Sequence, residues 1–178
     1  MTPLHPGDLL DHYRIEKLVA RSGMASIYQA TDTVDDRTVA IKVPHPEMEA
    51  DPLLFDRFKR EQEIGMKLDH PGVMKVFNDE KRSRVYMVME WVDGKLLRNE
   101  LSEKGKFPAD RAVHIAARIC DALDYIHTQG VTHRDMKPEN IMIDADDKIK
   151  IIDFGIAGNE GSRRLTFAKL SNVMGTPD

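Results

Sequence analysis

Two charged side chains in the first half of the chain point to one interaction. Alternation along residues 38–43 places Lys42 on the same face of an expected strand as the small Ala40. In the helix that follows, Glu61 falls on the inward stripe of the 3.6-residue period, where an unpaired carboxylate is costly. Such a carboxylate needs a cation, and Lys42 is the obvious one. The alternative is that Lys42 and Glu61 are separate surface charges.

A second set of polar residues occurs in a fixed order further along. Residues 131–140 read Val-Thr-His-Arg-Asp-Met-Lys-Pro-Glu-Asn, and Asp-Phe-Gly at 153–155 begins thirteen residues after Asn140. Together with Val-Ala-Ile-Lys at 39–42, this order and spacing resembles the protein kinases. The segments Ser-Gly-Met-Ala at 22–25 and Met-Gly-Thr-Pro at 174–177 resemble those of the bacterial eukaryotic-like (Hanks-type) serine/threonine kinases, which are signalling enzymes. The resemblance extends from Tyr13 to the end of the chain.

The resemblance implies a reaction and a role for each polar residue. Phosphoryl transfer requires that two negatively charged reactants be positioned and that developing charge be neutralised. Lys42, held by Glu61, would contact the α and β phosphates of ATP. Asp135 would accept or orient the proton of the substrate hydroxyl, and Lys137 would contact the transferred phosphate. The residues expected to carry catalysis are therefore Lys42, Glu61, Asp135 and Lys137.

The same resemblance implies a magnesium site and an adenine slot. Asn140 and Asp153 offer the oxygen ligands that Mg²⁺ prefers, with Mn²⁺ as an alternative ion. His133 and Phe154 are expected to pack rather than to react. The base would lie in an apolar slot with polar groups at its rim. The residues expected to contact the nucleotide are Ala20, Ser22, Gly23, Ala25, Ile27, Ala40, Lys42, Met89, Glu90, Val92, Met142 and Asp153.

The sequence departs from the family pattern at several points. Ala20, Ser22 and Ala25 occupy the positions of the three glycines that normally cradle phosphate, where a Cβ would cost about 1 kcal/mol at positive φ. Gly65 replaces a larger apolar residue, so we expect the helix that carries Glu61 to be loosely held. The chain ends before the Ala-Pro-Glu type segment, so we expect a truncated domain with an exposed apolar face on the helix 108–129.

Residue patterns predict an α+β, protein-kinase-like two-lobed fold, with a complete antiparallel-sheet N-lobe, one main helix and a partial helical C-lobe. We expect the N-lobe over 1–90, a hinge over 91–95 and the partial C-lobe over 96–178. Alternation, apolar periodicity and the Asp51-Pro52 helix start are the local signals. They predict strands at 13–20, 25–31, 38–43, 73–77, 84–91, 141–143 and 149–152, and helices at 52–68, 96–103 and 108–129.

Composition excludes several classes of protein. With 41% hydrophobic and 31% charged residues, the chain has the balance of a folded globular protein. A net charge of −4 gives no reason to expect a nucleic-acid partner. No run is long and apolar enough to span a membrane, so we expect a cytoplasmic domain, whose parent protein could still be anchored elsewhere. The single cysteine, Cys120, lies in an apolar helical pattern and is expected to be a buried thiol.

Three functions remain open at this stage. The leading one is an ATP- and Mg²⁺-dependent, non-specific serine/threonine protein kinase acting on protein substrates. The second is a pseudokinase or nucleotide-binding scaffold without turnover, and the third is a small-molecule kinase of the same fold. Arg134, beside Asp135, suggests regulation by a phosphorylated loop residue. We therefore expect autophosphorylation in trans at Thr166 or Ser171. Copies of the chain are expected to meet either in this reaction or by self-association through the exposed C-lobe face.

Overall fold

The computed structural model describes residues 3–78, 82–154 and 158–159. Contacts between residues divide the chain into two compact units. The first contains residues 1–67 and 75–91, and the second contains residues 68–74 and 92–178. The short segment 68–74 thus groups with the second unit, although it precedes the expected boundary near residue 90. No helix in the described part of the chain is both long enough and apolar enough to cross a membrane.

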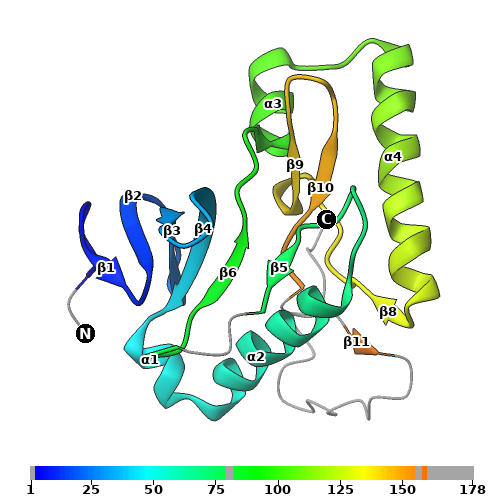
Figure 1. Ribbon diagram of the computed structural model, residues 1–178. Coiled ribbons are helices and arrows are strands. Elements are labelled where there is room, and N and C mark those ends of the chain that lie inside the picture. The colour runs from blue at the N-terminus through cyan, green and yellow to red at the C-terminus, as the bar shows by residue number, and fades with distance from the viewer. Residues whose placement is uncertain (1–2, 79–81, 155–157, 160–178) are drawn as a thin grey trace. The chain divides into compact units, whose positions relative to one another are not determined.

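The first unit is built on one antiparallel sheet, drawn in Figure 1. The three long strands match the alternating segments at 13–20, 25–31 and 38–43, whereas the strands predicted at 73–77 and 84–91 are shorter. Val73 makes only an isolated bridge, to Ile151 in the second unit. The spatial order of the sheet is β1 (Leu9–Leu10), β2 (Tyr13–Arg21), β3 (Ala25–Asp32), β4 (Arg37–Pro44), β6 (Met87–Glu90) and β5 (Val76–Phe77).

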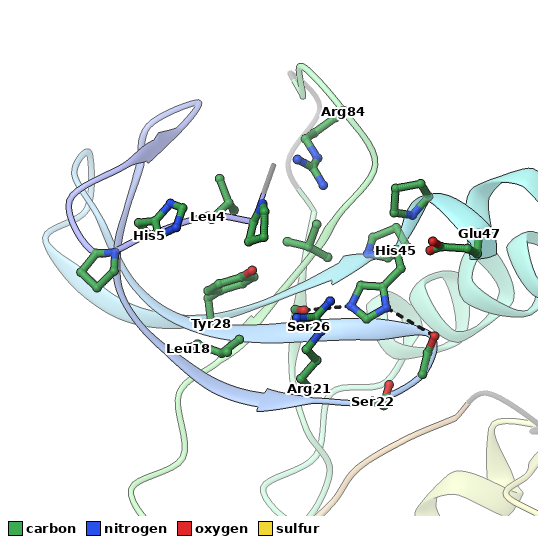
Figure 2. A pocket seen from close by; sticks show the side chains of 16 residues that line it. Leu4, His5, Leu18, Arg21, Ser22, Ser26, Tyr28, His45, Glu47 and Arg84 are labelled. Carbon is green, nitrogen blue, oxygen red and sulfur yellow. Dashed lines mark hydrogen bonds between the residues drawn. The ribbon is translucent and has the colours of Figure 1, made fainter. Parts of the chain in front are cut away.

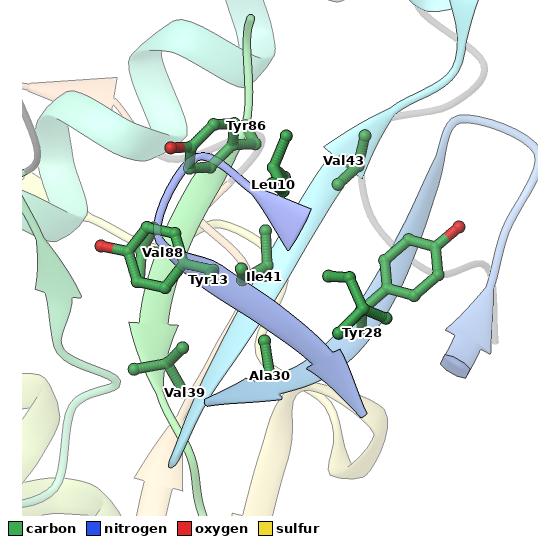
Figure 3. Packing of buried hydrophobic residues seen from close by; sticks show 10 residues of the cluster. Leu10, Tyr13, Tyr28, Ala30, Val39, Ile41, Val43, Tyr86 and Val88 are labelled. Atoms are coloured by element: carbon green, nitrogen blue, oxygen red, sulfur yellow. The ribbon is translucent and has the colours of Figure 1, made fainter. Parts of the chain in front are cut away.

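The two faces of this sheet have different compositions. Register pairs Ile27 with Lys42 and Ala40 with Met89, so these residues share one face. The opposite face carries the apolar core of the unit, shown in Figure 3, which is covered by β1 and the residues around it. That core consists of Leu10, Tyr13, Ile15, Tyr28, Ala30, Val39, Ile41, Val43, Tyr86 and Val88. Packing on the apolar face therefore holds the strands together, and the face with Lys42 remains available for polar contacts.

Two helices follow β4 in the first unit, α1 (Pro46–Ala50) and α2 (Pro52–Lys67). The predicted start of α2 is confirmed, because Asp51 Oδ1 accepts hydrogen bonds from the backbone N–H groups of Leu53 and Leu54 at 2.9 and 3.3 Å. The predicted inward stripe is also present, since Phe58 and Glu61 are both buried. The cap therefore sets where α2 begins, and its apolar stripe sets which way it faces.

Gly65 on α2 faces β5, so the glycine has a packing role that the family pattern did not predict. A Cβ built on Gly65 would overlap the side chain of Val76 on β5. The missing side chain therefore allows the backbone of α2 to approach β5 closely. The larger residue that the family pattern favours would have no room in this arrangement.

The second unit is mainly helical (Figure 1). Its helices are α3 (Leu97–Lys104) and α4 (Ala109–Thr128), close to the predicted ranges. The predicted hairpin is present as β9 (Ile141–Ile143) and β10 (Ile149–Ile151), with β7 (Lys95–Leu96) added beside β9. The remaining short elements are β8 (Val131–Thr132), the 3₁₀ turn η1 (Pro138–Asn140) and β11 (Gly158–Asn159), which pairs with β8.

The prediction that Cys120 is buried is wrong. Its thiol is exposed, because α4 buries the face that carries Ile115, Ala122 and Ile126. Part of the predicted apolar stripe therefore lies outside the buried face of α4, and Val113 in that stripe is 69% exposed. The expected exposure of an apolar face on this helix is therefore confirmed.

Candidate active site

A lysine and a carboxylate form the polar feature of the first unit. Lys42 Nζ donates to both carboxylate oxygens of Glu61, at 2.6 and 2.8 Å. β4 supplies the lysine and α2 the carboxylate, and both side chains are at least four-fifths buried. The alternative of two separate surface charges is therefore excluded. A buried bidentate contact of this kind fixes the position of the ammonium group.

The loop between β2 and β3 is ordered by a serine rather than by glycines. The Ser22 hydroxyl accepts from the backbone N–H groups of Met24 and Ala25 at 3.2 and 3.1 Å, and donates to the carbonyl of Ala25 at 3.2 Å. None of residues 20–25 has a positive φ. The strain expected from a Cβ at Ser22 and Ala25 is therefore absent, because the loop uses conformations open to any residue. Sequence reasoning missed this role of the serine.

The expected nucleotide contacts are divided between the two units. Ile27, Ala40 and Met89 share the sheet face of Lys42, as the register shows. Glu90 ends β6, where its carboxylate accepts from the backbone N–H of Lys75 at 2.7 Å. Val92 and Met142 belong to the second unit, and both are half-buried. Within the first unit, small and apolar residues thus line the sheet face that carries the ammonium group.

Three polar residues meet in the loop between β8 and β9. Lys137 Nζ lies 2.8 Å from Asp135 Oδ2. The Asn140 amide donates to the carbonyl of Asp135 at 2.8 Å and to its carboxylate at 3.0 Å. Asn140 is buried, at the end of the turn η1. The loop therefore brings together Asp135, Lys137 and Asn140.

The charges in this cluster stabilise one another. Burial opposes ionisation of Asp135, but hydrogen bonds from Lys137 and Asn140 outweigh it, and the pKa of the carboxyl group lies below its usual value. The hydrogen bond to Asp135 in turn raises the pKa of Lys137. At neutral pH the pair is therefore a carboxylate beside an ammonium group. Such a pair can orient a hydroxyl group and attract an anion at the same point.

His133 supports the loop from within, as expected. It is 1% exposed, its Nε2 lies 3.2 Å from the carbonyl oxygen of Ile152, and its Nδ1 accepts from the backbone N–H of Asp135 at 3.3 Å. Its ring lies 5.1 Å from that of Phe154. Burial lowers the pKa of His133, so the ring is neutral at pH 7. These contacts make it a packing residue that joins Asp135 to the segment before Asp153.

Two residues beside this cluster have unusual backbone conformations. Arg134 has φ of 67° and Asp153 has φ of 64°, in the left-handed region that non-glycine residues rarely adopt. Each costs of order 1 kcal/mol or more, so surrounding contacts must hold it. Here a hydrogen bond from the backbone N–H of Ile152 to the carbonyl of Asn140, at 2.9 Å, secures the strand before Asp153.

The oxygen groups present fit a magnesium ion shared with a phosphate ligand. Because Asn140 uses its NH₂ to hold Asp135, the Oδ1 side of its amide is the side left to accept. Asp153 adds a carboxylate. The described residues contain no group of three or more acidic, histidine or cysteine side chains able to enclose a metal. Mg²⁺ commonly binds through one or two protein ligands, with phosphates and water completing the shell.

A comparison with models of known protein families identifies the family of this chain. Residues 13–178 match the model of the protein kinase domain. The chain belongs to the protein kinase domain family. A solved structure with the same fold is the kinase domain of Mycobacterium tuberculosis PknI, with a TM-score of 0.73 and 29% identity over 88% of this chain and 64% of that one. The sheet unit and the helical unit are thus parts of a protein-kinase fold.

Curated relatives in bacteria are serine/threonine kinases by name. The probable serine/threonine-protein kinase PknB of Lactococcus lactis is 40% identical over 149 residues, which are 83% of this chain and 24% of that protein. Serine/threonine-protein kinase PknE of Mycobacterium tuberculosis is 39% identical over 165 residues, 92% of this chain and 29% of that protein. The kinase chain therefore spans about a quarter of the length of these relatives.

Proposed function

We propose that this chain is the ATP- and Mg²⁺-dependent catalytic domain of a serine/threonine protein kinase, acting in the cytoplasm on serine and threonine hydroxyls of proteins. The observation that carries the proposal is the pair of preassembled charge clusters. One is the Lys42–Glu61 ion pair, with contacts of 2.6 and 2.8 Å. The other is the Asp135–Lys137–Asn140 cluster. A buried ion pair is often no more stabilising than an apolar replacement, so a purely structural role is a weak explanation for the Lys42–Glu61 pair.

In this proposal each cluster has a distinct task. Lys42, fixed by Glu61, contacts the α and β phosphates and neutralises part of their charge. Asp135 orients the attacking hydroxyl and accepts its proton, while the ammonium group of Lys137 stabilises the transferred phosphoryl group. The ionised state of the Asp135–Lys137 pair supports this division, because an aspartate kept as a carboxylate can accept a proton.

The cofactor residues complete the proposal. Asn140 and Asp153 would hold Mg²⁺, or Mn²⁺ in its place, and the ion when bound supplies positive charge to the phosphates. The proposed nucleotide-binding lobe lies within residues 1–90, apart from residues 68–74, which group with the second unit. The proposed hinge is 91–95, and 96–178 would carry the catalytic, magnesium and activation loops. The residues proposed to contact ATP are Ala20, Ser22, Gly23, Ala25, Ile27, Ala40, Lys42, Met89, Glu90, Val92, Met142 and Asp153.

Regulation forms a further part of the proposal. Arg134 is exposed beside Asp135, so its guanidinium can receive a phosphate. Thr166 and Ser171, the proposed sites of autophosphorylation in trans, lie outside the described residues. Mass spectrometry after incubation with MgATP should find phosphate on one of them, and an Arg134→Ala variant should lose the resulting activation.

Nucleotide binding tests the proposed assignments directly. We expect MgATP to bind, measured by calorimetry, and chelation of Mg²⁺ to weaken ATP binding at least about tenfold, because the ion links phosphates to Asp153. Lys42→Met should weaken MgATP binding by about tenfold, since it removes a charge-assisted contact. Lys67→Met, an exposed lysine at the end of α2, is the matched control and should bind normally. Equal binding with and without Mg²⁺, or normal binding by Lys42→Met, would refute the assignments.

A further inference from the structure

The sheet of the first unit has a cavity on the face turned away from Lys42. Its volume is about 840 Å³, and it lies between the N-terminal segment, the ends of β2 to β4 and the start of α1. Figure 2 shows the side chains that surround it. Strand register separates the cavity from the nucleotide face, because Arg21 pairs with Ser26 and Ser26 with Val43, one residue out of phase with Ile27 and Lys42. Ser22 and Gly23, in the loop between β2 and β3, also line the cavity, so it adjoins the proposed nucleotide contacts but opens on the opposite face of the sheet.

One part of the cavity wall is apolar. Leu4, Leu18, Tyr28 and Val43 all line it. Tyr28 and Val43 are buried in the sheet core, whereas Leu18 remains 50% exposed on the neighbouring strand. A solvent-exposed leucine beside a buried aromatic ring offers contact area to a hydrocarbon group. The wall therefore suits a ligand with a small apolar body.

The remaining wall carries two arginines without acceptors. Arg21 and Arg84 line the cavity, and neither guanidinium makes an ion pair or hydrogen bond within the described part of the chain. Arg84 Nε is buried and has no hydrogen-bond acceptor there. A buried N–H group without an acceptor is rare, because its lost hydration is not replaced. Among the described residues, Glu47 is the one acidic side chain that lines the cavity, and it is exposed, so this part of the wall favours an anion.

Hydrogen bonds hold the wall next to Arg21 in place. Ser26 Oγ lies 2.9 Å from His45 Nε2, and His45 Nδ1 lies 3.3 Å from the carbonyl oxygen of Gly23. Because the carbonyl of Gly23 can only accept, Nδ1 donates to it; Figure 2 marks both hydrogen bonds of the ring with dashed lines. The backbone N–H of His45 also donates to the carbonyl of Met24 at 2.8 Å. A wall fixed in this way forms a site before any ligand arrives.

We propose that this cavity binds a small amphipathic anion, a ligand class distinct from the nucleotide of the proposed kinase site. The apolar body lies against Leu18 and Tyr28, and the anionic head accepts hydrogen bonds from the guanidinium of Arg84. Arg21 adds a second positive charge at the rim. The proposal goes beyond phosphoryl transfer and stands or falls without it.

An NMR titration of the intact chain, without nucleotide, tests the site. The probe is 4-phenylbutyrate, an aromatic carboxylate, and 4-phenyl-1-butanol is its neutral counterpart. We expect saturable shifts at the backbone amides of Leu18, Ser26 and His45. The alcohol should bind about tenfold more weakly, because it lacks the charge that Arg84 satisfies. Equal binding of acid and alcohol would overturn the proposal on the unmodified protein, as would acid shifts confined to the Lys42 face or to α4.

Variants locate the anionic head. Arg84→Gln should weaken 4-phenylbutyrate binding about tenfold, and Arg21→Gln about threefold, since its charge is more exposed. Arg14→Gln is the matched control, because Arg14 is an exposed arginine on β2 that is paired with Glu16 outside the cavity. It removes the same charge and should leave binding unchanged. A loss that is equal in all three variants, or absent from both cavity variants, would refute the site.

Discussion

At the residue scale, Ser22 orders a loop in which the family pattern has glycine. Its hydroxyl closes a tight turn with Met24 and Ala25, and no residue in the loop needs positive φ. Glycine at this position would remove three hydrogen bonds and add conformational freedom. The loop is therefore ordered by a side chain where the family pattern relies on backbone freedom.

The expected effect of Ser22→Gly follows from this geometry. We expect MgATP affinity, measured by calorimetry, to fall about two- to fivefold, because the loop must be ordered on binding. Ser22→Thr keeps the hydroxyl group and should bind within about twofold of the unchanged chain. Tighter binding by Ser22→Gly would instead mean that the Cβ strains the loop.

Gly65 gives a second test at this scale. Glycine to alanine in a helix normally stabilises a protein by up to about 1 kcal/mol. At Gly65 we expect the opposite sign, a loss of about 1–3 kcal/mol in the free energy of unfolding, because the new methyl group would overlap Val76. Met66→Ala changes the exposed neighbour and should stay within about 0.5 kcal/mol. Urea unfolding measures both, and a stabilised Gly65→Ala protein would show that α2 is free to move.

At the element scale, a charge network joins the helices of the second unit to its three-stranded sheet, β7, β9 and β10. Glu100 on α3 is 4% exposed and accepts from Lys95 of β7, Lys104 of α3 and Arg111 of α4, at 2.8, 2.7 and 3.0 Å. Arg111 also binds Asp147, in the turn between β9 and β10, at 2.6 Å. One carboxylate and one guanidinium thus connect elements that are separate in the sequence.

The network predicts a pH dependence. Hydrogen bonds from Lys104, Lys95 and Arg111 lower the pKa of Glu100 from 4.5 to about 2. Because the folded pKa lies below the unfolded one, the stabilisation is fully present above about pH 4.5 and is lost as pH falls toward 2. Glu100→Gln should therefore lower the melting temperature at pH 7, and the difference should shrink at pH 3. A difference that is the same at both pH values would contradict the role of the charge.

At the scale of the whole molecule, the sequence predicted the helices and strands that local residue patterns define. It did not predict features that depend on tertiary contacts. Alternation gave β2, β3 and β4, and the Asp51 cap gave the start of α2. Combining two periodicities suggested the Lys42–Glu61 pair but left two separate surface charges as an alternative, which the contacts between the two side chains exclude. Apolar periodicity alone could not say which face of α4 is covered, and so Cys120 was assigned wrongly. The family glycine pattern likewise could not reveal that Ser22 would close its loop by hydrogen bonds.

The candidate site was predicted as a set of residues, not as a geometry. The spacing of Asp135, Lys137 and Asn140 identified them, because motif residues keep their order along the chain. Their mutual hydrogen bonds depend on rotamers and on the turn η1, which no residue pattern specifies. The unusual φ angles of Arg134 and Asp153 are also set by tertiary contacts rather than by residue type.

Transfer of labelled γ-phosphate from ATP tests the central claim most directly. With Mg²⁺ present, we expect this chain to label serine and threonine peptides but not a matched tyrosine peptide. Asp153→Asn should reduce labelling about a hundredfold or more, because it removes a proposed metal ligand. The control Lys67→Met should label normally. A chain that binds MgATP yet transfers no phosphate, or an Asp153→Asn variant with normal transfer, would contradict the account.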